Sequence, residues 1–155
     1  MNALRRQWKS ERGAELIEFA LILPMLLLIM LAIVDFGFMV QRYEVLTNAA
    51  REGARIAVLP GYTTADVKAR VCAYVENGGV PATGCPDPSN PAIQVNDVAI
   101  PMPVGAALEG KEVLVTYTHA YMFVGPIAGL LSGTLTTSFP LTSVAIMRNE
   151  LASAP

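Results

Sequence analysis

The residues whose types and spacing could most clearly do chemistry lie where a long apolar run begins. Gly13 is followed by Ala14, and Glu18 comes five residues after the glycine, just before an uncharged stretch over residues 19–34. A lone carboxylate on a membrane-spanning helix costs roughly 2.5–3.5 kcal/mol near the bilayer centre and less near the interface. A chain that keeps such a group usually uses it. The junction therefore offers a peptide bond that can be cut beside a small residue and a carboxylate that can pair with a positive group.

Elsewhere the sequence offers little chemistry. His119 is the only histidine, and it lies in an alternating pattern that predicts a partly buried or surface residue of a strand. One histidine and two cysteines cannot supply a standard four-ligand zinc site. Nucleophile-elbow, phosphate-loop and zinc-protease motifs do not occur in the sequence. We therefore expect no catalytic residue, no metal and no cofactor, and we predict a protein that is not an enzyme.

The apolar run is long enough to cross a membrane. Residues 16–40 would form about 37 Å of helix. The leader before them carries four cations, Arg5, Arg6, Lys9 and Arg12, against one acid. By the positive-inside rule the N-terminus stays in the cytoplasm and the rest is exported. The sequence thus predicts a single-pass protein of the cytoplasmic (inner) membrane. Asp35 falls near the outer boundary, where we expect either solvation or a second contact between helices, for instance with Arg42.

Composition limits the partners of the exported part. Of 155 residues, 53% are hydrophobic and 15% are charged. Without the leader, seven cations remain against twelve acids, a net charge of −5. An acidic exported part argues against binding nucleic acid. About 95 residues follow Pro60, which is enough for a small core.

Three interpretations of the N-terminus compete. A secretory signal peptide would need a small-x-small cleavage site after the apolar core, and none follows Val34 within reach. A plain anchor explains the leader and the apolar run, but not Glu18 or the junction between Gly13 and Ala14. Proteolytic processing at the glycine explains all of these features.

The third interpretation rests on a resemblance. The segment Gly13-Ala-Glu-Leu-Ile-Glu18-Phe19 resembles a prepilin-type processing site: a glycine, the cut, and a glutamate at the fifth mature position. More specifically, four segments resemble the TadE-like family of the tight-adherence (Flp-type) pilus apparatus: residues 12–24, 35–37, 48–55 and 141–149. The resemblance covers both ends of the chain and leaves a variable middle.

The resemblance implies a pilin-like fold and a role as a pseudopilin or minor pilin. A membrane-bound prepilin peptidase would cut after Gly13, and Glu18 would pair with the new amine of Ala14 on a neighbouring subunit. The implied partners are other pilins and pseudopilins, inner-membrane platform proteins and, through them, an assembly ATPase. The rival hypothesis is an unprocessed bitopic protein whose exported domain binds a periplasmic or extracellular partner.

The elements that position these groups begin with one long helix. Nothing interrupts helical periodicity between residue 41 and Leu59, and Pro60-Gly61 ends the helix. Small residues recur on one face and would let another backbone come close: Ala49, Ala50, Gly53, Ala54 and Ala57. We therefore divide the chain into a leader (1–13), a transmembrane helix (14–40), its exported continuation (41–59) and an exported α+β domain (60–155).

Within that domain, Thr63 and its neighbours can cap a second helix up to Glu76, whose apolar side is Val67, Val71, Tyr74 and Val75. Three antiparallel strands are predicted: 92–100 with a bulge at Asn96-Asp97, 112–123, and 134–147 with an interruption at Pro140. The apolar segment 125–133 either covers the sheet, rests on the membrane surface or contacts a partner subunit. An α+β fold follows from this order.

The two cysteines are both predicted to be exported. Cys72 and Cys85 would then lie where oxidation is permitted, so we expect a disulfide, with two unpaired buried thiols as the alternative. Closing a loop of this size would stabilise the domain by roughly 3 kcal/mol in the chain-entropy model.

Overall fold

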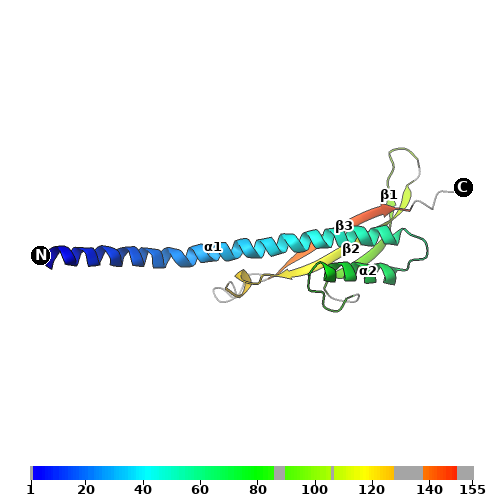
Figure 1. Ribbon diagram of the computed structural model, residues 1–155. Helices are drawn as coiled ribbons and strands as arrows, with labels where there is room; N and C mark the ends of the chain where they lie inside the picture. The colour runs from blue at the N-terminus through cyan, green and yellow to red at the C-terminus, as the bar shows by residue number, and fades with distance from the viewer. Residues whose placement is uncertain (1, 86–89, 106, 128–137, 150–155) are drawn as a thin grey trace. The chain divides into compact units, whose positions relative to one another are not determined.

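The computed structural model of the protein describes residues 2–85, 90–105, 107–127 and 138–149. The elements are α1 (Asn2–Ala57), α2 (Thr64–Asn77), β1 (Ala92–Ile100), β2 (Leu108–Ala120) and β3 (Ser138–Arg148), coloured in chain order in Figure 1. Two helices and an antiparallel sheet make the α+β fold that the sequence predicts. The described residues form two compact units. The N-terminal unit contains residues up to Gly37 together with residues 121–127, and the sheet unit contains residues 38–120 and 138–149.

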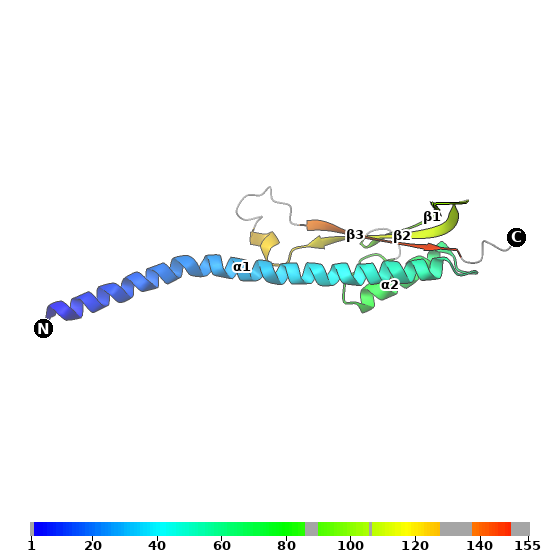
Figure 2. The ribbon, with the colours of Figure 1, turned by 90° about the horizontal axis from the view of Figure 1, so that it is seen from above.

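The first helix, α1, contributes to both units. It is continuous through Pro24, and Figure 2 shows that its N-terminal half is curved, as a proline inside a helix favours. The helix ends at Ala57, two residues before the predicted end. Gly61 then adopts a φ of +88°, a conformation that glycine reaches without a steric penalty. The Pro60-Gly61 pair therefore turns the chain toward α2.

The second helix begins at a capping box. The Thr63 hydroxyl accepts the backbone N–H of Asp66 at 3.3 Å, and Asp66 Oδ2 accepts the backbone N–H of Thr63 at 2.8 Å. The Thr63 hydroxyl also donates to the Asp66 carboxylate, and these hydrogen bonds lower the pKa of Asp66. Two backbone donors that the helix itself cannot satisfy are paired in this way. The sequence predicts this start correctly.

The sheet has the order β1-β2-β3, with both pairs antiparallel. The predicted bulge at Asn96-Asp97 is wrong, because these residues pair in unbroken register with Glu112 and Lys111. The predicted interruption at Pro140 is also wrong. Pro140 lies inside β3 opposite Thr118, and an edge strand tolerates proline because the outward side needs no N–H.

The strand bounds differ from the predicted ones at three ends. β2 begins at Leu108 instead of residue 112 and ends at Ala120 instead of residue 123. The following residues leave the sheet and form a helical turn over residues 124–127. β3 continues to Arg148. The predicted start of the third strand at residue 134 and most of the apolar segment 125–133 lie outside the described residues.

The core of the sheet unit lies between the two helices and one face of the sheet (Figures 1 and 2). Its members come from every element: Leu46, Ala49, Ala50, Ala54, Ile56, Val67, Val71, Cys72, Val75, Val80, Ile93, Val113, Val115, Tyr117 and Leu141. The prediction for Tyr74 is wrong, because its side chain is exposed and Cys72 is buried on that side of α2 instead. The alternating apolar residues of β2 follow the predicted pattern and face the helices.

Candidate processing and assembly segment

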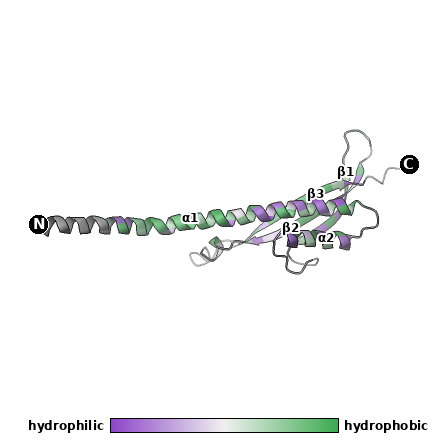
Figure 3. Ribbon diagram, in the orientation of Figure 1, coloured by the Kyte–Doolittle hydropathy of each residue, from purple (hydrophilic) through white to green (hydrophobic). Residues whose placement is uncertain are grey.

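The N-terminal half of α1 is an apolar surface with no protein cover. Its large hydrophobic side chains from Leu16 to Val34 are exposed on every side of the helix, apart from the half-buried Leu31. Figure 3 colours the ribbon of this stretch mainly green, for hydrophobic residues. Among the described residues this is the one helix long and apolar enough to cross a membrane. A helix that is hydrophobic all round needs an apolar surrounding. Lipid or other apolar helices can provide it, so the helix indicates a single-pass membrane protein.

Gly13 lies inside this helix, next to Ala14. A Cβ atom built at Gly13 would meet no atom within 4 Å, so the described packing does not require glycine here. Glycine is also less favourable than alanine in a helix interior by about 1 kcal/mol. The glycine therefore weakens the helix locally without any packing benefit.

Glu18 is exposed on the apolar helix one turn further along. Among the residues whose side chains the structure describes, no hydrogen-bond or ion-pair partner of Glu18 is found. A carboxylate in an apolar surrounding needs a hydrogen-bonded positive partner to offset its desolvation. The described side chains of this chain do not supply that partner.

Asp35 corrects a prediction. Asp35 is only 2% exposed, so the expectation that its carboxylate is simply solvated is wrong. Its Oδ1 accepts the backbone N–H of Met122 at 3.1 Å, and its Oδ2 accepts those of Phe123 at 3.0 Å and Val124 at 2.8 Å. Three consecutive amides thus bind one carboxylate within the N-terminal unit. The sequence did carry a signal, since Asp35 is the only charged residue between Glu18 and Arg42.

His119 also differs from expectation. It is 1% exposed, and Arg42 Nη1 lies 2.6 Å from its Nδ1. Arginine can only donate, so Nδ1 accepts and the proton of the neutral imidazole is on Nε2. The Arg42 guanidinium also lies 5.9 Å from the centre of the Tyr117 ring. This pair ties α1 to β2 inside the sheet unit, and it is structural in character.

The small residues of α1 pack inside the chain itself. Ala49, Ala50 and Ala54 are completely buried in the core of the sheet unit. A Cβ atom at Gly53 would lie 2.5 Å from Val71 Cγ2, so glycine is required for the close approach of α2. Ala57 is half-buried against the same core. The structure therefore assigns this face to intramolecular packing.

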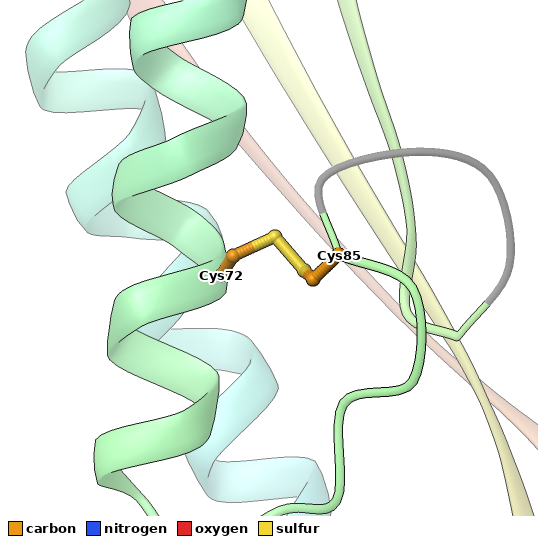
Figure 4. The surroundings of a disulfide bond; sticks show 2 residues. All are labelled: Cys72 and Cys85. Carbon is orange, nitrogen blue, oxygen red and sulfur yellow. A yellow bond between two sulfur atoms is a disulfide. The ribbon is translucent and has the colours of Figure 1, made fainter.

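The disulfide is present as expected. Cys72 of α2 is bonded to Cys85 in the loop that precedes β1, and their Cα atoms are 5.8 Å apart (Figure 4). The bond fixes this loop to α2, so the loop is held by a covalent link as well as by packing.

An ion-pair network joins α1 and α2 and was not predicted. Arg55 donates two hydrogen bonds to the Glu52 carboxylate at 2.9 and 3.0 Å, and Arg70 donates to it at 3.1 Å. The Arg55 hydrogen bonds, then those of Arg70, lower the pKa of Glu52 from 4.5 to about 2, against the opposing effect of burial. The spacing of Glu52 and Arg55 could have revealed half of this network. Among the described residues, no group of three or more histidines, cysteines or acids could hold a metal ion.

With this geometry in place, the chain can be compared with known proteins. Residues 13–55 match the family model of TadE-like proteins. No curated protein and no solved structure matches the chain. The TadE-like match begins at Gly13 and covers Glu18, Asp35 and Arg42, together with the small residues Ala49, Ala50, Gly53 and Ala54 of α1. It is the family that the sequence resembles, and the match suggests involvement in the tight-adherence (Flp) pilus, with pilus-related protein partners in general.

Proposed function

We propose that the chain is a pseudopilin or minor pilin that helps to assemble or initiate a tight-adherence (Flp) pilus. One observation carries the proposal: the first part of the TadE-like segment, residues 16–34, is an apolar helix with large side chains exposed on every side, and Glu18 lacks a partner among the described side chains. Five residues before this acid stands Gly13, which the described packing does not require. These features fit a helix made to be cut and then packed against similar helices.

Cleavage after Gly13 would have two physical consequences. It removes the four leader cations, each of which opposes withdrawal of the helix into the bilayer. It also creates an amine on Ala14. When helices bundle, Glu18 of one subunit pairs with the amine of another, and burying both charges together is far less unfavourable than burying either alone.

The bilayer itself opposes this association only weakly. A lipid-exposed apolar helix can move into a bundle of similar helices with little hydrophobic penalty, because one apolar surrounding replaces another. Packing and the pairing of polar groups then decide which helices associate. This supports the proposed pairing of Glu18 with a neighbouring amine. Glu15 and Glu18 are the first two charged side chains of the mature chain, and Glu18 is the one at the start of the uncharged run.

The proposed topology places the leader (1–13) in the cytoplasm, residues 14–40 in the inner membrane, and residues 41–155 outside it. The partners are a prepilin peptidase, other pilins and pseudopilins, and inner-membrane platform proteins that connect to an assembly ATPase. The sheet unit is large for a bulk filament subunit, since the major pilins of such systems are very short chains. We therefore place this subunit at initiation or at the filament tip.

The processing step is tested by co-expression with and without a prepilin peptidase. We expect the mature protein to begin at Ala14 only when the peptidase is active, as measured by intact mass. Gly13→Val should abolish the shift because a branched side chain would block access to the bond. Gly37→Val is the matched control, since a Cβ atom there also meets nothing within 4 Å. An unchanged start at Met1 with active peptidase would favour the unprocessed bitopic protein.

The assembly step is tested by Glu18→Ala. We expect this variant to be cut normally but not to support piliation, because the neighbour's amine loses its carboxylate. Glu15→Ala, which removes the other exposed acid of the same turn, is the control and should retain more piliation. Normal piliation by Glu18→Ala would contradict the proposed pairing.

A further inference from the structure

The strongest feature outside the proposed assembly chemistry is the contact of Asp35 with the segment after β2. Three consecutive backbone amides bind this buried carboxylate, with hydrogen bonds of 3.1, 3.0 and 2.8 Å. The contact lies wholly within the N-terminal unit. It fixes residues 122–124 against α1 at the level where the uncharged run over residues 19–34 ends.

This arrangement leaves an apolar surface around Asp35. On α1, Phe36 next to Asp35 is 60% exposed, and on the bound segment Met122 is 56% exposed. Asp35 itself is covered. The exposed apolar residues of α1 therefore continue past position 35, and the segment that Asp35 binds adds an exposed apolar side chain at Met122.

The hydrogen bonds matter because of what lipid demands of a backbone. Irregular backbone at membrane depth is tolerated only where its polar groups are satisfied by protein, since lipid offers no hydrogen-bond partners. The segment leaves β2 at Ala120 and does not become helical until residue 124. Asp35 supplies the acceptors for the N–H groups of residues 122–124, so these three donors stay paired when the stretch approaches the membrane.

We infer that residues 122–127 form a second membrane contact, an apolar wedge held by Asp35 in the headgroup region of the outer leaflet. The occupant of this surface is lipid, because the surface is continuous with the apolar helix proposed to span the bilayer. The wedge sets how deeply α1 sits, since it stops the helix at the level of Asp35. The inference rests on the membrane attachment within the proposed function and goes beyond its pilus role.

The test uses the full-length protein in phospholipid vesicles. Trp8 is the only tryptophan, so Trp8→Phe gives a background without tryptophan fluorescence. Into it we place Met122→Trp, with Tyr62→Trp as the control. Tyr62 is 54% exposed and follows the end of α1, about 25 Å of helix beyond Val40. Vesicles contain either ordinary phosphatidylcholine or lipid brominated high on the acyl chain, which quenches nearby tryptophan.

We expect Met122→Trp to lose most of its fluorescence in brominated vesicles, and Tyr62→Trp to keep it. Adding Asp35→Asn should restore the fluorescence of Met122→Trp, because an amide has one acceptor oxygen and would turn N–H donors toward the three amides. Retention of the far-UV circular dichroism and of the melting transition of the sheet unit shows that the variant is folded.

Two outcomes would overturn the inference. The first is that Met122→Trp keeps its fluorescence in brominated vesicles; a blue shift without quenching would then mean that protein, for instance a second copy of the chain, covers the surface. Quenching that persists with Asp35→Asn would show that Asp35 does not hold the wedge. If the protein fails to float with vesicles, the membrane attachment in the proposed function fails instead, so the two failures are distinguishable.

Discussion

At the scale of single residues, the polar groups inside this protein are bound by partners far away in the chain. Asp35 is hydrogen-bonded to residues 122–124, which follow it by 87 to 89 positions in the sequence. Arg42 is hydrogen-bonded to His119, which follows it by 77 positions. Each arrangement satisfies a group whose burial would otherwise be unfavourable. Removing one member should therefore cost more than removing both.

His119→Leu tests this rule in the sheet unit. The change introduces an apolar side chain of similar size and removes the acceptor of the Arg42 Nη1 hydrogen bond. We therefore expect the free energy of unfolding to fall by about 1–3 kcal/mol. Urea unfolding of the detergent-solubilised protein measures it. The double variant with Arg42→Met should recover part of the loss. Equal losses in the single and double variants would contradict the pairing.

The Glu52 network makes stability depend on pH. The pKa of Glu52 is about 2 in the folded chain against 4.5 for the ordinary group, because Arg55 and Arg70 favour the carboxylate. A lowered folded pKa contributes stability that is complete above 4.5 and is lost as the pH falls from about 4.5 to about 2.

Both arginine side chains are more than half exposed, so solvent screens the pairs and we expect about 1 kcal/mol at neutral pH. Glu52→Gln should be less stable than the wild type at pH 7 and nearly equal to it at the acid end of that window. Glu44→Gln, at an exposed acid of the same helix, is the control. A pH-independent difference would refute the assignment.

At the scale of elements, α1 plays two roles along its length. Its first half is exposed and apolar, while residues from Leu46 to Ile56 supply part of the core of the sheet unit. The small residues let α2 approach closely, so they serve the fold of this chain.

Gly53 is where this packing is tightest. Gly53→Ala would place a Cβ atom 2.5 Å from Val71 Cγ2 and 3.2 Å from Val113 Cγ1. Overpacking of this kind typically costs about 1–3 kcal/mol. Gly37→Ala, in the same helix with open space around it, should leave stability unchanged or raise it slightly. Thermal melting of the two variants compares them, and equal melting temperatures would show that the core yields without strain.

At the scale of the whole molecule, two units depend on different environments. The sheet unit has its own apolar core and a disulfide, whereas no side chain of α1 from Leu16 to Val34 is buried within the described chain. Unfolding of the sheet unit should therefore leave the membrane attachment of the apolar helix unchanged.

Removal of the disulfide tests whether the stability of the sheet unit and the membrane attachment are independent. Cys72→Ser with Cys85→Ser should lower the free energy of unfolding of the sheet unit by about 3 kcal/mol, because the unfolded chain loses a constraint across a separation of 13 residues. Flotation with vesicles should not change. The same loss should follow treatment of the wild type with a reductant. Concerted loss of folding and flotation would mean that the units are not independent.

Much of the secondary structure and of the division into units can be predicted from local sequence patterns. The apolar run, the basic leader, the Thr63 cap, the Pro60-Gly61 stop and the alternation of β2 each depend on neighbouring residues, so the sequence predicts the fold class and the order of the elements, with exact bounds for β1. The prediction was wrong for both ends of β2 and for the burial of Tyr74, because these depend on which residues meet another element. Whether Gly13 is cut and Glu18 is paired remain predictions from the same local pattern.

What only the tertiary structure decided is the fate of the groups that bind across the fold. Asp35 is bound by backbone amides, and every residue other than proline carries that donor, so no side-chain pattern can mark the partner in advance. His119 and Gly53 likewise acquire their roles from elements that are distant in sequence. Local chemistry determines which elements form, whereas packing determines which buried polar groups meet.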